Sequence, residues 1–322
     1  MFLLVWEFLE DNTSNIVNSF WQLMEKVWYI HIKDFSRLQD LSLDKLNQIE
    51  YIISRWAHFL YSGQILSKFP NLKEIFLFQI WNDNVDLKYC KEKWIKVKNF
   101  ISKKSVQSVA ELTLWMLIMW IRQWFNLGCK LKNWIYTRSP IGKNLENITI
   151  WVMGCGRIGQ KVIELLQAFP IKIITYDIVF GFREKEPWLV DLETNLKSNW
   201  VQISADLDKF LQKANYITVH IPGVKENLGL LNYSKLQNVG WVVNLSRAGI
   251  VNEGDILKLL NEWKMEFYAT DVVAWEPYIK KINKQLLEHE KVFITPHIGA
   301  NTVQVQEEIM GEFLEEVGKV LG

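Results

Sequence analysis

Arg247, Glu276 and His297 are three side chains in the last third of the chain whose types suit acid–base chemistry on a carboxylic acid. Each comes shortly after a β-rich apolar run that predicts a buried strand. In an open parallel sheet the carboxyl ends of the strands form the ligand crevice. We therefore expect the three side chains to converge at one edge of a sheet.

Their chemistry divides naturally into three roles. A guanidinium grips a carboxylate in a forked geometry that an ammonium cannot copy, so Arg247 would bind and polarise the substrate. An imidazole exchanges protons near neutral pH, so His297 would be the general acid and base. A carboxylate beside it raises its pKa and orients it, which is the role expected for Glu276. Taken singly, plainer roles stay open: a structural ion pair, an exposed loop carboxylate and a helix-cap neighbour.

A glycine-rich segment in the middle of the chain has the pattern G-x-G-x-x-G. It is the run Gly154-Cys155-Gly156-Arg157-Ile158-Gly159, between a strand-like stretch (148–152) and a helical one (160–169). In that context Gly154 allows a tight turn, Gly156 lets the backbone approach a pyrophosphate, and Gly159 permits close helix–sheet packing. The pattern predicts a dinucleotide site. The alternative is a glycine-rich turn without a ligand, with the aspartate at the end of the next strand capping the segment that follows.

Asp177 indicates which dinucleotide would bind. It ends the next predicted strand, 18 residues after Gly159. A carboxylate there can accept hydrogen bonds from both ribose hydroxyls of the adenosine and would repel a 2′-phosphate, so NAD is favoured over NADP. Reduction of a 2-oxo acid by NADH needs the same set of groups: a hydride donor, a proton donor and a cationic anchor.

Strand and helix patterns alternate along the chain in two series. The predicted strands are 2–5, 50–54, 75–78 and 95–97, then 148–152, 172–176, 216–219, 242–244, 267–269 and 292–294. Helical patterns cover 15–26 and 43–48, a long apolar stretch at 106–126 that could link two domains, and an amphipathic stretch at 303–320. The fold class expected is α/β, with two doubly wound parallel-sheet domains, Rossmann-like or flavodoxin-like, and a cleft between them.

Composition narrows the classes of partner. The 322 residues are 49% hydrophobic and 23% charged, with a net charge of +1, so we expect neither a nucleic-acid nor a membrane partner. The longest apolar run, Leu112–Ile121, is too short to span a bilayer. Three cysteines lie far apart, which predicts neither a disulfide framework nor a zinc site and fits a reducing, cytoplasmic location.

From about Leu72 onward, the chain resembles the D-isomer-specific 2-hydroxyacid dehydrogenases, the family that includes phosphoglycerate dehydrogenase. The segments G-x-G-R-I-G, V-H-I-P, N-L-S-R-A-G, D-V-V-A-W-E-P and T-P-H-I-G follow in the family's order. The resemblance implies hydride transfer between NAD and a small D-2-hydroxy acid or its 2-oxo acid. Further hypotheses stay open: a 3-phosphoglycerate dehydrogenase specifically, or a non-catalytic NAD(H)-sensing binding protein.

The resemblance also implies domains, partners and residue roles. A discontinuous substrate-binding domain (1–104 plus 298–322) would surround an NAD-binding domain (105–297), in a homodimer. Asp271 would contact the nicotinamide carboxamide, and Ile80, Trp81, Asn82, Arg247 and His297 would bind substrate. The full cofactor set is Gly154, Gly156, Arg157, Ile158, Gly159, Asp177, His220, Ile221, Pro222, Leu245, Ser246, Arg247, Asp271, His297 and Gly299, with no metal ligand.

Tryptophan is unusually common. The chain has 16 Trp and only 16 Gly. The family usually has glycine at six positions where this chain has tryptophan: Trp81, Trp94, Trp151, Trp241, Trp263 and Trp275. Random loss of glycine does not produce one replacement repeatedly. We hypothesise a gene that uses UGA for glycine, here read as tryptophan; the alternative is genuine divergence with an altered pocket.

Overall fold

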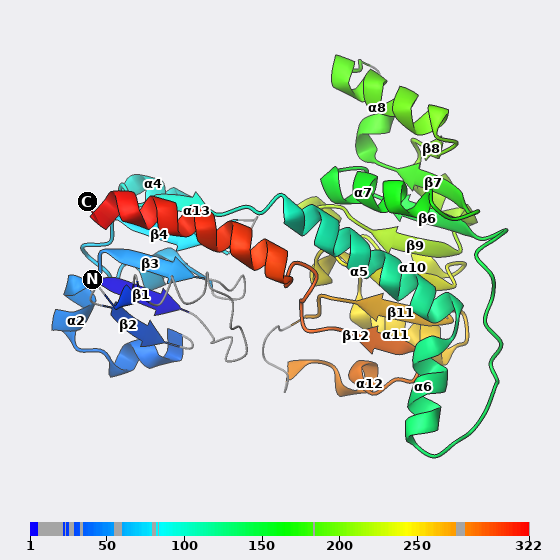
Figure 1. Cartoon of the computed structure of the whole chain (residues 1–322), viewed down its shortest axis with the longest axis horizontal. Coiled ribbons are helices and arrows are strands. Elements are labelled where there is room, and N and C mark those ends of the chain that lie inside the picture. Colours follow the sequence, from blue (N-terminus) through cyan, green and yellow to red (C-terminus); the bar gives the residue numbers. More distant parts are fainter. Residues whose placement is uncertain are drawn as a thin grey trace. The chain divides into compact units, whose positions relative to one another are not determined.

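A computed structural model describes residues 1–5, 22, 24–25, 29–32, 35–54, 60–78, 82, 84–182, 184–274 and 281–321. The chain forms two compact units, Met1–Ser105 with Thr302–Gly322, and Val106–Asn301. Figure 1 shows a parallel sheet with helices on both faces in each unit. Residues before Ser105 and after Thr302 therefore fold together, although nearly two hundred residues separate them in sequence.

The first unit has a five-stranded parallel sheet in the order β2-β1-β3-β4-β5. Its strands are β1 (Phe2–Val5), β2 (Tyr29–Ile32), β3 (Tyr51–Ser54), β4 (Glu74–Leu77) and β5 (Lys96–Asn99). Its helices are η1 (Phe35–Asp40), α2 (Leu43–Gln48), α3 (Gly63–Leu66), α4 (Leu87–Glu92) and the C-terminal α13 (Val303–Leu321). This strand order is the flavodoxin-like form of a doubly wound sheet.

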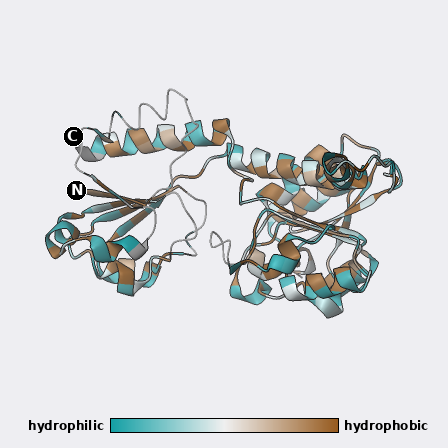
Figure 2. Cartoon of the chain, turned by 90° about the horizontal axis from the view of Figure 1, so that it is seen from below, coloured by the Kyte–Doolittle hydropathy of each residue, from teal (hydrophilic) through white to brown (hydrophobic). Residues whose placement is uncertain are grey.

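Both faces of this sheet are buried, because successive side chains of a strand point to opposite sides. Leu3 and Val5 lie in one apolar cluster, and Phe2 and Leu4 lie in another. The second cluster includes residues of α13, which alternates hydrophobic and hydrophilic positions along its length (Figure 2). The last helix is therefore part of the first unit's core.

The second unit has a seven-stranded parallel sheet in the order β12-β11-β10-β9-β6-β7-β8. Its strands are β6 (Thr149–Met153), β7 (Lys172–Tyr176), β8 (Gln202–Ser204), β9 (Tyr216–Val219), β10 (Trp241–Asn244), β11 (Phe267–Thr270) and β12 (Val292–Ile294). Its helices are α5 (Lys104–Ile121), α6 (Trp124–Lys132), α7 (Arg157–Leu166), η2 (Ile178–Gly181), α8 (Pro187–Ser198), α9 (Leu207–Lys213), η3 (Lys225–Asn227), α10 (Tyr233–Leu236), η4 (Ala248–Ile250), α11 (Glu253–Asn261) and α12 (Lys284–Leu287). The direction of winding reverses between β6 and β9, as in dinucleotide-binding sheets.

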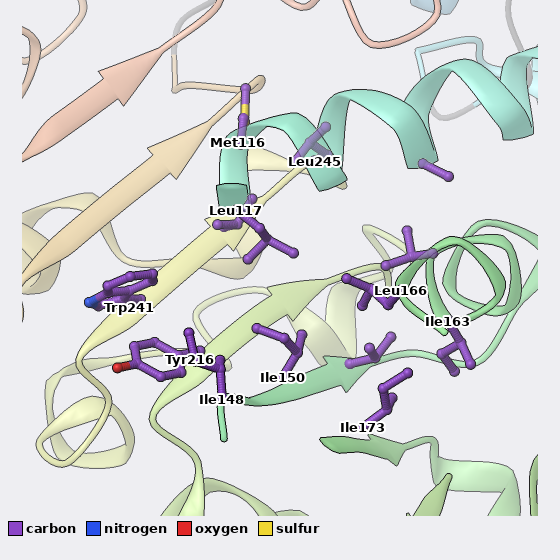
Figure 3. Close-up of a cluster of buried hydrophobic side chains, with 14 of the residues drawn as sticks. Met116, Leu117, Ile148, Ile150, Ile163, Leu166, Ile173, Tyr216, Trp241 and Leu245 are labelled. Carbon is purple, nitrogen blue, oxygen red and sulfur yellow. The ribbon is translucent and has the colours of Figure 1, made fainter. Parts of the chain in front are cut away.

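One face of this sheet carries the largest apolar cluster. Figure 3 shows Leu117 of α5 and Ile163 and Leu166 of α7 gathered with Ile150 and Tyr216 of the strands. Helices α9, α10 and α11 cover the opposite face, where Ile217 and Val219 lie in a second apolar cluster. Both faces of the strands are therefore buried, as expected of an all-parallel sheet. The core thus fixes the strand ends that carry the candidate site.

The predicted fold class is confirmed by the two parallel sheets, and some predicted elements differ. Two short strands, β2 and β8, were not predicted. The single helix predicted at 106–126 is two helices. Gln123 has a φ of 56°, which interrupts the helical hydrogen-bond pattern between α5 and α6. The helix predicted at 15–26 falls largely outside the described residues.

Across the described ranges, no helix is both long and apolar enough to cross a bilayer. The three cysteines, Cys90, Cys129 and Cys155, are free thiols, and two of them are buried.

Candidate functional site

Most of the predicted site residues lie at the carboxyl edge of the seven-stranded sheet. The glycine loop follows β6, Asp177 follows β7 and His220 follows β9. Arg247 follows β10, and Asp271 and His297 follow β11 and β12, which are consecutive neighbours in the sheet. The sheet therefore brings the turns that carry Arg247, Asp271 and His297 to one edge, and β9 lies between their strands and β6, the strand that ends in the glycine loop.

Some predicted residues lie elsewhere. Glu276, Ile80 and Trp81 fall outside the described residues. Asn82 belongs to the first unit, where its side-chain oxygen is buried and has no hydrogen-bond partner among the residues described.

The glycine loop depends on glycine at two places for its own shape. Gly154 has a φ of +99°, and a Cβ there would lie 2.7 Å from the His220 carbonyl carbon and oxygen. A Cβ at Gly159 would lie 1.9 Å from the Gly154 oxygen. Both positions exclude any larger residue, since real Cβ atoms do not approach so closely.

Gly156 differs, because nothing lies within 4 Å of the place where its Cβ would be. It is the N-cap of α7, and no side chain caps the helix there. The open space in front of an uncapped helix N-terminus, flanked by a glycine, fits a pyrophosphate approached by backbone N–H groups. Burial raises the pKa of the Cys155 thiol to about 12, so the loop adds no thiolate to repel an anion.

Asp177 connects the end of β7 to the glycine loop through a hydrogen bond. Its carboxylate accepts hydrogen bonds from the Cys155 N–H (2.8 Å) and from the Val179 N–H (3.3 Å). It therefore caps the next segment, as the plainer interpretation expects, and it also lies beside the loop, where a ribose-binding carboxylate is required.

His220 is a half-buried residue at the end of β9. Its Nε2 lies 2.8 Å from the Thr218 hydroxyl, and its Nδ1 is buried with no hydrogen-bond partner in the described part of the chain. Burial lowers the pKa of the imidazole to about 3. The neighbouring Ile221 carbonyl accepts a short hydrogen bond from the Ser246 hydroxyl, which joins the turns after β9 and β10.

Arg247 packs against a glycine that sequence reasoning did not single out. A Cβ at Gly223 would lie 2.5 Å from the Arg247 Cγ. The Arg247 backbone carbonyl accepts from the Asn244 amide (3.0 Å), and its Nη1 donates to the Ser246 carbonyl (2.8 Å). The absence of a side chain at Gly223 thus leaves the space that the Arg247 stem occupies.

His297 lies in a left-handed turn with a φ of 55°. Asp271 holds the residues on either side of it: its carboxylate accepts from the Thr295 hydroxyl (2.6 Å), the Ile298 N–H (2.7 Å) and the Gly299 N–H (2.7 Å). Burial raises the pKa of Asp271, and these three hydrogen bonds oppose that rise. The Thr295 hydroxyl thus joins the turn that carries His297 to Asp271, a contact that the sequence pattern did not indicate.

Glu253 was also missed. Its carboxylate accepts from the Ala274 N–H at 2.8 Å, so the first residue of α11 anchors the chain just before the segment that carries Glu276. A carboxylate in the first turn of a helix usually interacts favourably with the helix dipole. Nothing in the sequence spacing indicates the additional hydrogen bond between Glu253 and Ala274.

The remaining predicted residues lie in the same turns. They are Arg157 and Ile158 at the start of α7, Pro222 after His220 and Ile221, Leu245 and Ser246 before Arg247, and Gly299 after His297.

Comparison with known proteins identifies the class. A model of the "D-isomer specific 2-hydroxyacid dehydrogenase, NAD binding domain" matches residues 114–299. The hydroxypyruvate reductase of Thermotoga maritima is 31% identical over 81% of this chain and 81% of its own length. The D-lactate dehydrogenase of Lactiplantibacillus plantarum is 28% identical over 74% of this chain and 72% of its own.

Solved structures agree on the fold. A D-lactate dehydrogenase from Aquifex aeolicus, complexed with NAD and lactic acid, superposes with a TM-score of 0.79 at 23% identity, covering 99% of this chain and 95% of that one. The chain belongs to the D-isomer-specific 2-hydroxyacid dehydrogenase family and is an NAD-dependent oxidoreductase that acts on hydroxy acids.

Proposed function

We propose that the protein transfers a hydride between NAD and a small D-2-hydroxy acid or its 2-oxo acid, with Arg247 as the substrate-binding residue and His297, supported by Glu276, as the acid and base. The observation that carries this proposal is the position of Arg247 and His297 after β10 and β12 of one parallel sheet, at the edge that also holds the glycine loop.

The cofactor, when bound, supplies or accepts the hydride. Gly154, Gly156 and Gly159 shape the loop that would take its pyrophosphate, and Asp177 would bind its ribose hydroxyls. Arg247 would hold the substrate carboxylate through two N–H groups. His297 would donate a proton to the carbonyl oxygen in reduction and remove it from the hydroxyl in oxidation.

The test is NADH oxidation across a panel of 2-oxo acids that includes hydroxypyruvate, pyruvate and 3-phosphohydroxypyruvate. Because a positioned acid contributes roughly 10²–10⁴-fold, His297→Ala should lower kcat by that factor while NADH still binds. Arg247→Ala should raise KM, and Arg247→Lys should not restore it, since an ammonium lacks the fork. Turnover that survives in His297→Ala would contradict the assignment of the acid and base.

The panel also separates the alternative functions. Preference for the phosphorylated acid would favour a 3-phosphoglycerate dehydrogenase. A D-3-phosphoglycerate dehydrogenase from Rattus norvegicus is 32% identical over 74% of this chain, and the match spans only 44% of that enzyme. NADH binding without turnover of any acid would favour an NAD(H)-sensing binding protein.

The roles of the two units follow from the same proposal. We assign NAD binding to Val106–Asn301, close to the predicted 105–297, because the matched family domain lies within it. The first unit would then bind substrate through Ile80, Trp81 and Asn82. The residues at 81 and 275 bear on this proposal, because the family resemblance predicts glycine at both, and both lie outside the described residues.

We also propose that the protein is a homodimer. Several apolar side chains are exposed on α6 and the segment after it: Trp124, Leu131, Ile135, Tyr136 and Ile141. Exposed apolar residues gathered on one segment favour a protein–protein contact. Light scattering should give a dimer mass for the protein and a monomer mass for a Leu131→Glu/Ile135→Glu variant. The control is Leu43→Glu, an exposed leucine of the first unit, which should leave the mass unchanged.

A cytoplasmic location completes the proposal, because three free cysteines fit a reducing compartment. Cell fractionation tests it directly, and recovery of the protein in a secreted fraction would contradict it.

A further inference from the structure

Four tryptophans share an unusual backbone conformation. Trp94, Trp134, Trp200 and Trp263 have φ values of 58°, 62°, 61° and 59°. Each follows the C-cap residue of a helix: α4, α6, α8 and α11 in turn. Nine of the described residues have a positive φ, and these four tryptophans outnumber the two glycines among them, Gly154 and Gly229. The same residue type therefore recurs at one structural position.

The hydrogen bonds show that this position is the C′ residue of a Schellman motif. At the end of α4, the Trp94 N–H donates to the Lys91 carbonyl (3.4 Å) and the Ile95 N–H donates to the Cys90 carbonyl (2.9 Å). The other three helix ends repeat the pair: Trp134 to Leu131 with Ile135 to Lys130, Trp200 to Lys197 with Val201 to Leu196, and Trp263 to Leu260 with Lys264 to Leu259. Glycine is the usual residue at C′, because it adopts the left-handed conformation without a Cβ clash.

Burial of the indole side chains does little to offset the cost of this backbone conformation. Their exposed fractions are 90%, 97%, 92% and 78%, so little of their apolar surface is buried. At Trp263 the Lys291 ammonium lies over the ring, 3.5 Å from the centroid, and such surface contacts are weak. A bulky side chain with so little burial at a position that favours glycine is a mismatch between residue and backbone.

We propose that glycine, and not tryptophan, stands at positions 94, 134, 200 and 263 of the protein as its own cell makes it, with each position encoded by UGA. The family resemblance also predicts glycine at positions 94 and 263, whereas the assignment of glycine at positions 134 and 200 rests on the backbone conformation alone. The family resemblance predicts glycine at positions 81 and 275 too, which lie outside the described residues. Left-handed backbone disfavours an indole whatever reaction the protein catalyses, so failure of the proposed function would leave this assignment untouched.

The backbone conformation does not support glycine at every tryptophan where the family resemblance predicts it. Trp151 and Trp241 lie buried in β6 and β10, where any residue can adopt the extended conformation. The Trp241 indole donates to Glu266 at 2.9 Å. For these two positions glycine stays a prediction from the family resemblance alone.

The direct test is peptide mass spectrometry of the protein purified from its own cells, together with its codons. Peptides spanning the four helix ends should carry the mass of glycine, and each codon should be UGA. A UGG codon or a tryptophan mass at any of the four overturns the assignment for that position, and at all four it overturns the proposal.

A stability test uses recombinant protein with tryptophan at all four positions. Each single Trp→Gly change at these positions should raise the folded-to-unfolded ratio by about 5–30-fold, because it relieves left-handed strain. The matched control is Trp→Ala at the same position, which removes the indole but keeps the Cβ and should gain much less. Equal gains for glycine and alanine would show that the indole, and not the backbone, is the unfavourable feature, and would contradict the argument.

A second control addresses tryptophan in ordinary backbone. Trp120 lies in α5, is 4% exposed and stacks on Phe267 with ring centroids 3.9 Å apart. Trp120→Gly should lower stability, since it removes a buried aromatic and adds a helical glycine. A rise in stability there would mean that loss of tryptophan stabilises the protein regardless of φ, which would also count against the proposal.

Discussion

Asp271 and His297 illustrate how a single residue shapes the candidate site. The carboxylate of Asp271 accepts from three donors on both sides of His297, which itself has left-handed backbone. A carboxylate can accept all three, because each oxygen has two lone pairs. The orientation of the proposed acid and base therefore depends on a residue that need not touch the substrate.

Asp271→Asn should misplace His297 and destabilise the fold. An amide nitrogen would face at least one N–H donor in place of an acceptor, so a buried charge-assisted hydrogen bond is lost. We expect about 1.5–3 kcal/mol lower unfolding free energy and a shifted pH profile of kcat/KM. Thr295→Ser is the control, because serine keeps the hydroxyl that donates to Asp271. Wild-type stability together with an unchanged pH profile in Asp271→Asn would refute the positioning role.

Gly156 and Gly159 should respond differently to alanine. The Gly159→Ala Cβ would collide with the Gly154 oxygen, so the unit should lose stability and dinucleotide binding together. The Gly156→Ala Cβ meets no protein atom within 4 Å, so the protein should fold normally yet bind NADH at least tenfold more weakly. Thermal unfolding and NADH titration separate the two effects. Normal NADH affinity in Gly156→Ala would show that the pyrophosphate does not bind at this loop.

The glycine loop and the positions of the candidate residues at strand ends could be predicted from the sequence, because motifs and hydrophobic periodicity are local patterns. The contacts of Thr295, Glu253 and Gly223 could not. Their roles depend on contacts with residues 24, 21 and 24 positions away, which no pattern within one segment encodes. The left-handed turn at His297 could not be predicted either, because a positive φ is uncommon outside glycine and the residue type alone does not mark it.

At the scale of elements, long periodic segments were predictable and short or interrupted ones were not. The strands β7, β9 and β12 lie where the pattern placed them, since each is an apolar run bounded by polar turns. The three-residue strand β8 is too short to show alternation. The break at Gln123 occurs inside an apolar stretch that gives no helix-stop signal.

The contact between α13 and the first sheet gives a prediction about elements. Phe313 is fully buried, with edge contacts to Phe76, Phe78 and Phe100 at centroid distances of 5.9, 5.0 and 5.6 Å. Phe313→Ala should lower the unfolding free energy by about 3–5 kcal/mol, and Phe313→Leu by less, because leucine refills part of the cavity. Chemical denaturation measures both. A loss below about 1 kcal/mol for Phe313→Ala would mean that α13 is not anchored through this cluster.

At the scale of the whole molecule, the two sheet orders explain why the sequence motifs alone were enough to indicate the family. The glycine loop requires a strand before it and a helix after it, and the β6–α7 pair supplies both. The order of motifs along the chain then matches the order of strands β9, β10, β11 and β12 across the sheet. The substrate specificity could not be predicted in this way, because the motifs lie in one unit and the residues expected to select the acid lie in the other.

Acid stability of the whole protein should depend on His220. Its folded pKa of about 3 lies below the ordinary value of 6.5, because burial disfavours the charged imidazole. The unfolded chain therefore binds a proton between those values that the folded chain does not. The contribution of His220 to the unfolding free energy is therefore fully present above about pH 6.5. It is lost as the pH falls toward 3, by about 3–5 kcal/mol in total. Denaturant unfolding of wild type and His220→Gln across this range measures the difference: the variant, which cannot titrate, should show a shallower acid loss. Parallel curves would mean that the imidazole titrates normally in the folded protein, and that the turn after β9 is open to solvent.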